Sequence, residues 1–154
     1  MSSREAFQIN SLDDYHTIIS SLLAQSDLKD FGNPYFLNIN YDMLAEAVSL
    51  VTTTFKDELQ KEIMSYSDSR LAYSFVYNTL VYALVNHRDQ VGETEITGML
   101  QVWSYVPVSS RSKMIKVLNE ELFIGDDTLL EQTATRDKFT QKKLSKIIPF
   151  PSKK

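Results

Sequence analysis

Few side chains in this sequence are suited to acid–base, nucleophilic or metal chemistry. The chain contains two histidines, His16 and His87, and no cysteine. A proton-transfer site usually holds a histidine against a carboxylate or beside a nucleophile, and Asp13, three residues before His16, offers one such pairing. This spacing is common for pairs on the surface of a helix, so we assign no catalytic residue.

Metal and phosphate sites also lack their usual sequence patterns. Without cysteine there are no thiolate ligands, and neither histidine belongs to a histidine pair or a Glu-x-x-His pattern. Glu58 and Glu62 lie four residues apart on one predicted helix face, which we interpret as a charged, solvent-facing side. Gly92 and Gly98 are isolated, and no serine lies in a Gly-x-Ser-x-Gly sequence. The prediction is a protein without enzymatic activity, cofactor or metal.

One apolar stretch, Leu71–Val85, predicts the element around which the others are arranged. Twelve of its fifteen residues are apolar or aromatic, so a helix built from it has no solvent-facing side. At about 1.5 Å per residue it spans roughly 22 Å, which is short of the ~30 Å hydrocarbon core of a membrane. We therefore predict a central buried helix at about 69–89 and expect no membrane partner.

Amphipathic patterns predict further helices on both sides of this central helix. The predicted ranges are 12–25, 41–65, 94–105 and 110–122. The expected N-caps are Ser11 (with Asp14 in a capping box), Asn40 or Asp42, Thr94, and Ser109 or Ser110. The segment 35–39 is expected to be an extended aromatic connector that packs on the core. With only four glycines and four prolines, the sequence favours an all-α, single-domain bundle of five or six helices.

Charge is distributed unevenly along the chain. Residues 1–135 carry nine Lys or Arg against nineteen Asp or Glu, a net charge of −10, whereas residues 136–154 carry seven against one, a net charge of +6. We divide the chain into a loose leader at 1–10, an acidic helical bundle at 11–135, and a basic C-terminal helix with a flexible tail at 136–154. The sequence leaves open whether the basic segment meets the acidic body, the solvent or an anionic partner.

Tyrosines give the first candidate binding surface. Tyr66, Tyr73 and Tyr77 are seven and four residues apart, so they are predicted to share a stripe on the central helix. Such tyrosines either pack in the outer layer of the core or form a half-buried interface. Because the surrounding helices are not expected to hide every tyrosine, the candidate protein interface comprises Tyr66, Tyr73, Tyr77 and Tyr82.

Basic residues give the second candidate surface. Arg111, Lys113 and Lys116 open a predicted helix, where phosphate contacts are often made, although Pro107 in the preceding turn departs from the usual helix-turn-helix pattern. The basic C-terminal segment could meet the same kind of partner. The candidate contacts to an anionic partner are Arg111, Lys113, Lys116, Arg136, Lys138, Lys142, Lys143 and Lys146.

Together these patterns predict a protein that acts by binding. The main hypothesis is an adaptor, a regulator or a small subunit of a complex, whose partner is another protein or a second copy of the chain. The alternative is a nucleic-acid-binding helical subunit that uses residues 111–116 and the basic C-terminus, against which the acidic body argues. The N-terminus shows no apolar run after a basic patch, so we expect a cytoplasmic protein.

Overall fold

The computed structural model describes residue 9 and residues 11–123. The chain divides into two compact units, Met1–Lys116 and Val117–Lys154, and each is described by itself. The described residues of the second unit are 117–123, which form the end of a helix and a π-helical segment, Asn119–Phe123. The predicted basic segment at 136–154 and nearly all of the predicted leader lie outside the described residues.

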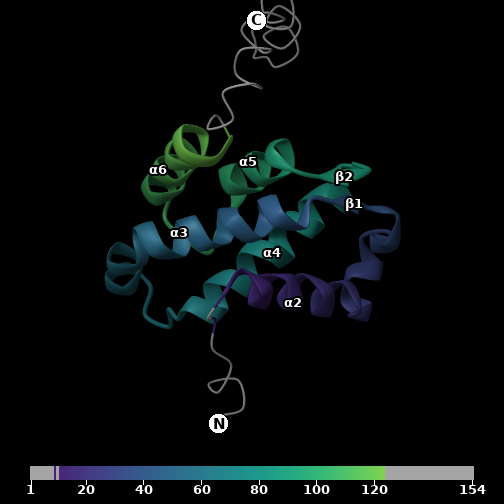
Figure 1. Cartoon of the computed structure of the whole chain (residues 1–154), viewed down its shortest axis with the longest axis horizontal. Coiled ribbons are helices and arrows are strands. Elements are labelled where there is room, and N and C mark those ends of the chain that lie inside the picture. The colour runs from purple at the N-terminus through teal and green to yellow at the C-terminus, as the bar shows by residue number, and fades with distance from the viewer. Residues whose placement is uncertain (1–8, 10, 124–154) are drawn as a thin grey trace, which may run out of the picture. The chain divides into compact units, whose positions relative to one another are not determined.

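The described part of the chain confirms the all-α architecture (Figure 1). Its α-helices are α2 (Leu12–Leu23), α3 (Tyr41–Glu62), α4 (Asp68–Val85), α5 (Glu93–Val102) and α6 (Val108–Leu118). Two short 3-10 helices, η1 (Ser26–Asp30) and η2 (Pro34–Phe36), follow α2. Two strands of two residues each, β1 (Asn38–Ile39) and β2 (Gln90–Val91), pair in parallel, with Asn38 opposite Gln90.

The predicted central helix is α4. It packs against α2, α3, α5 and β2, and Figure 1 shows it crossing α3, with α2 and α5 on opposite sides. Its large side chains Leu71, Phe75 and Leu80 are fully buried. Thr79 is buried as well, and its hydroxyl donates to the Phe75 carbonyl at 2.7 Å, so this polar group keeps a partner inside the core.

Local capping contacts fix the first residues of three helices close to their predicted positions. The Ser11 amide donates to Asp14 Oδ2 at 3.1 Å before α2, as the predicted capping box requires. Asn40 Oδ1 accepts from the Met43 amide at 3.1 Å before α3. Ser67 Oγ accepts from an amide in the first turn of α4 at 3.2 Å. Each cap satisfies an amide that the helix itself leaves without a partner.

The end of α4 differs from the prediction, because the helix stops at Val85 and not near residue 89. The His87 amide donates to the Leu84 carbonyl at 3.1 Å, and the Arg88 amide donates to the Ala83 carbonyl at 2.8 Å. His87 has a φ of +57°, so these bonds form a Schellman motif closed by a residue other than glycine.

Gly92, and not the predicted Thr94, is the N-cap of α5. It precedes α5, where its amide donates to Glu95 Oε1 at 2.9 Å. Glu95 is buried, and its other oxygen lies 3.7 Å from Nε of Arg88. The carboxylate is thereby used to cap α5 and to tie it to the segment that follows α4.

Trp103 joins the end of α5 to α4. Its buried ring lies edge-on to Phe75, with centroids 5.3 Å apart, and its Nε1 donates to Ser74 Oγ at 2.9 Å. On its other side it stacks with Tyr105. In the part of the chain that the structure describes, no helix has both the length and the apolar character needed to cross a membrane.

Candidate functional site

The structure separates two of the candidate interface tyrosines from the others. Tyr66 precedes the first residue of α4, and its hydroxyl donates to Asp68 Oδ1 at 2.9 Å. Tyr82 lies against α5, where its ring occupies the space that a Cβ on Gly98 would need. Both residues are half-buried and engaged inside the first unit.

Tyr73 and Tyr77 begin a partly exposed row along α4. Residues four apart lie in one row on a helix surface, and this row continues through Val81 to Val85. Tyr73 and Val85 are exposed, whereas Tyr77 and Val81 are half-buried. The central helix therefore has one side that its described neighbours cover only in part, contrary to the expectation of a helix without a solvent-facing side.

Two of the three candidate basic residues on α6 make contacts inside the first unit. Arg111 Nη1 donates to the carbonyl of Gln101 at 2.9 Å, and Lys113 Nζ lies 3.7 Å from Glu58 Oε2. The carboxylate of Glu58 offsets the charge of Lys113, and the bond to Gln101 occupies one of the donors of Arg111. Lys116 is exposed on α6, and the remaining candidates, Arg136, Lys138, Lys142, Lys143 and Lys146, lie outside the described residues.

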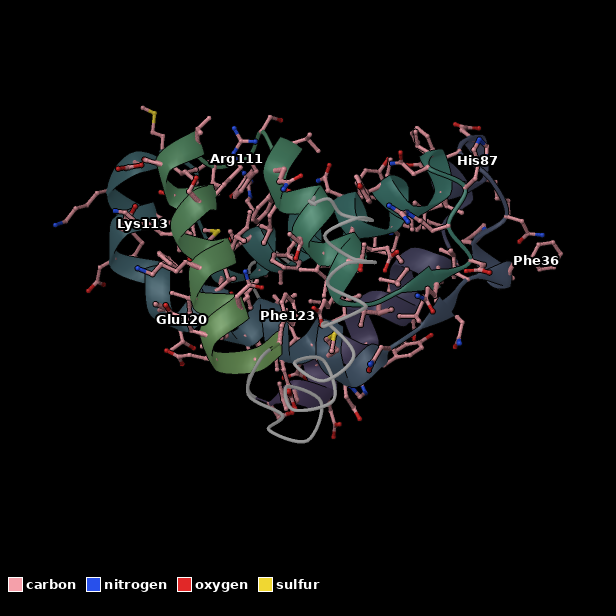
Figure 2. All side chains as sticks on the ribbon, turned by 90° about the horizontal axis from the view of Figure 1, so that it is seen from above. Phe36, His87, Arg111, Lys113, Glu120 and Phe123 are labelled. Atoms are coloured by element: carbon pink, nitrogen blue, oxygen red, sulfur yellow. The ribbon has the colours of Figure 1, made fainter. Side chains whose placement is uncertain are left out.

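The most exposed aromatic side chains of the described residues lie between α2 and β1. Phe36 is 80% exposed, Tyr35 is 64% exposed and Phe31 is 41% exposed, and we call these three residues the aromatic connector. Figure 2 shows Phe36 projecting from the end of the unit that also carries His87, whereas Arg111 and Lys113 lie in the other half of the view. The expectation that residues 35–39 form an extended segment packed on the core is wrong for Tyr35 and Phe36, which belong to η2 and are exposed.

Backbone hydrogen bonds hold the two outward-facing rings in place. The Tyr35 amide donates to Asn33 Oδ1 at 3.0 Å, which caps η2. The next two amides, of Phe36 and Leu37, donate to the carbonyls of Asn33 and Pro34 at 3.2 and 3.1 Å. Pro34 is buried and anchors the turn. The chain therefore presents its two most exposed rings on a defined backbone.

Gly32 attaches the other side of the connector to the end of α4. It has a φ of +151°, a backbone conformation that residues with a Cβ rarely adopt. A Cβ at this position would lie 3.2 Å from Leu84 Cδ2. Phe31 is thereby placed at the last turn of α4, where Val85 is also exposed.

Burial raises the pKa of the Glu93 carboxyl and of three tyrosines, and the tyrosines are unsuited to acid–base chemistry near neutral pH. Burial raises the pKa of Tyr15, Tyr66 and Tyr105 above the usual 10, and the bond to Asp68 raises that of Tyr66 further. A general acid or base works best with a pKa near the operating pH, and these groups lie farther from it than ordinary tyrosines. Among the described residues, no three His, Asp or Glu side chains come together as a metal site would require.

Comparisons of the chain with protein-family models, with curated proteins and with solved structures found no match. Function is therefore inferred from the described residues themselves. The surface that sequence reasoning missed is the aromatic connector. One signal could have found it, because Asn33-Pro34 is a typical start of a short turn, and connecting segments run over the protein surface.

Proposed function

We propose that this protein acts by binding another protein, as an adaptor, a regulator or a small subunit of a complex, and that the aromatic connector carries the binding. The observation that supports this most is the pair Tyr35 and Phe36, both mostly exposed on a backbone held by hydrogen bonds. Aromatic side chains are enriched at the centres of protein interfaces.

The energetics favour a role in binding over a role in folding. Full burial of a Phe side chain contributes about 1.5–3 kcal/mol, and Phe36 at 80% exposure realises little of that within the described structure. A partner that covers both rings can gain the remainder. Because η2 already holds the backbone, the entropy lost on binding is smaller than for an unstructured loop.

Nucleic-acid binding has less support. Arg111 and Lys113 are engaged with Gln101 and Glu58, and carboxylates outnumber basic residues in the described part of the chain. The partner class that best fits exposed aromatic rings on an acidic body is a protein.

Affinity capture of partners from the native source tests the proposal. The double variant Tyr35→Ser with Phe36→Ser is expected to lose partners that the unchanged chain retains. Met64→Ser is the matched control, because Met64 is fully exposed in the turn between α3 and α4, away from the connector. Recovery of the same partners by all three proteins would contradict the proposal.

Light scattering of the same three proteins tests whether the partner is a second copy. Self-association through the connector predicts a higher mass for the unchanged chain and for Met64→Ser, and a monomer for the double variant. If all three proteins are monomers, the partner that the connector binds is a different protein and not a second copy of this chain.

A further inference from the structure

Among the described residues, the backbone beside the aromatic connector has one edge that pairs with no other strand. The amides of Asn38 and Asn40 donate to the carbonyls of Asp89 and Val91, both at 3.0 Å, so these residues face β2. Successive residues of a strand point their backbone groups to opposite sides, so the groups of Leu37 and Ile39 face away from β2.

Three of these outward groups make no hydrogen bond among the described residues. They are the Ile39 amide, the Ile39 carbonyl and the Leu37 carbonyl, whereas the Leu37 amide is used by η2. Ile39 and Leu37 are half-buried, and Asn38 and Asn40 are exposed. Alternating donors and acceptors along an open strand edge are complementary to another extended backbone.

The side chains beside this edge indicate which sequence an added strand would carry. Tyr35 and Phe36 directly precede β1 and offer two exposed rings to apolar side chains. The segments that form this end of the unit carry more exposed carboxylates than cations. Their basic residues are Lys29 and Arg88, of which Arg88 is paired with Glu95, and one of the carboxylates, Asp42, lies 3.2 Å from His16 Nε2. The exposed carboxylates are Asp27, Asp30, Asp42, Asp89 and Glu93.

We propose that the open edge of β1 binds an extended peptide segment of a partner protein, in which apolar residues alternate with Lys or Arg. The segment adds to β1 as a third strand, exchanges hydrogen bonds with Leu37 and Ile39, and packs its apolar residues on Tyr35 and Phe36. This inference rests on the proposed function and specifies the form of its partner.

A displayed library of random dodecapeptides, selected on the full chain, provides the probe. The selected peptides are expected to alternate apolar and basic residues and to lose binding to the double variant Tyr35→Ser with Phe36→Ser. In an added strand, alternate peptide residues point their amides toward β1, and the residues between them point their amides away. N-methylation of the first set is expected to weaken binding at least about tenfold, and N-methylation of the second set less than about twofold. A peptide that binds as a helix does not show this alternation.

Substitutions at Ile39 test the edge from the side of the protein. Ile39→Pro removes the outward amide, and Ile39→Ala is the matched control that loses the side chain but keeps the amide. Ile39→Pro is expected to bind the selected peptide about tenfold more weakly than Ile39→Ala. If Ile39→Pro does not fold, hydrogen exchange replaces this comparison. Peptide binding is then expected to slow the exchange of the Ile39 amide in the unchanged chain.

The outcomes separate the two proposals. Peptides that need Tyr35 and Phe36 but tolerate N-methylation of both sets of residues overturn strand addition and leave the proposed function intact. A library that yields no peptide dependent on these rings also overturns strand addition. Partners captured equally well by the double variant overturn the proposed function itself.

Discussion

His87 holds a backbone conformation that suits glycine better than histidine. Its φ of +57° closes the Schellman motif at the end of α4, and the amides of His87 and Arg88 satisfy two carbonyls of the last turn. A Cβ in the left-handed region crowds the following carbonyl, at a cost of about 1–2 kcal/mol, and branching at Cβ increases the crowding.

Two substitutions at this position are therefore expected to change the free energy of unfolding in different directions. His87→Gly should leave the free energy of unfolding equal to or slightly above that of the unchanged chain, and His87→Val should lower it by about 1 kcal/mol or more. Urea denaturation measures both. Thr53, exposed on α3, is the matched control, because there the valine variant should be more stable than the glycine variant. The same order at both positions would contradict a left-handed requirement at residue 87.

Gly98 is a second position at which a neighbouring side chain, the Tyr82 ring, limits which residue fits. A glycine inside a helix costs about 1 kcal/mol relative to alanine, yet alanine at this position would overlap the Tyr82 ring. Gly98→Ala is expected to destabilise the unchanged chain by about 1 kcal/mol and to stabilise a Tyr82→Ala chain by a similar amount. Thermal denaturation of the unchanged chain, the two single variants and the double variant provides the test. Additive effects on stability would show that the contact between residue 98 and Tyr82 contributes nothing to it.

At the scale of elements, one polar contact joins α6 to α3. The Ser110 hydroxyl is buried and donates to Glu58 Oε2 at 2.6 Å, while Lys113 lies 3.7 Å from the same oxygen. Ser110 was considered as a cap for this helix, but α6 begins two residues earlier, at Val108. Glu58, predicted to face solvent, is instead half-buried beneath α6.

The two contacts to Glu58 should contribute unequally to stability. A hydrogen bond to a charged group contributes about 1.5–3 kcal/mol, so Ser110→Ala is expected to lower the free energy of unfolding by about that amount. Lys113→Ala should lower it by less than about 1 kcal/mol, since its side chain is 60% exposed and the ion pair is screened by solvent. Urea denaturation of both variants measures the difference, and equal losses would contradict this assignment.

Elements differed in how well the sequence predicted them. The starts of α2, α3 and α4 were predicted closely because each depends on a cap within three residues of the chain. The end of α4 was predicted four residues too late, because His87 carries no glycine signal for a left-handed residue. The strands β1 and β2 are two residues long, which is too short for any alternating pattern.

The candidate site was predicted less well than the fold. Exposure of Tyr35 and Phe36 depends on the capped turn at Asn33 and on Gly32 lying against Leu84, a contact between residues 52 positions apart. The roles of Glu58 and Arg111 likewise depend on partners in other elements. Sequence periodicity reports which side of a helix is apolar, but it does not report which helix will lie beside it.

For the molecule as a whole, three tyrosines with raised pKa values make the first unit less stable at high pH. Burial raises the pKa of Tyr15, Tyr66 and Tyr105 above 10 in the folded state, while the unfolded chain titrates near 10. Above about pH 10 the unfolded state therefore releases protons that the folded state retains. The stability contributed by these groups is fully present below pH 10 and is lost as the pH rises through the folded-state values.

The free energy of unfolding is accordingly expected to fall steeply between about pH 10 and pH 11. Tyr66→Phe should make this fall shallower, because the bond to Asp68 adds to the effect of burial at this position. Tyr35→Phe is the matched control, because it makes the same change at a mostly exposed position. Urea midpoints measured across this pH range provide the test. If the midpoints of all three proteins fall in parallel with pH, Tyr66 does not contribute to the loss of stability.

The parallel pairing of β1 with β2 has a consequence for the order of folding. The two strands flank α3 and α4, so their pairing closes a loop of about fifty residues, with an entropic cost of about 3.5 kcal/mol for an unfolded chain. A few backbone hydrogen bonds do not offset this cost until α3 and α4 have packed together. The strands should therefore pair after the rate-limiting step of folding and separate early in unfolding. A ligand that adds to β1 would then slow unfolding while leaving the folding rate almost unchanged.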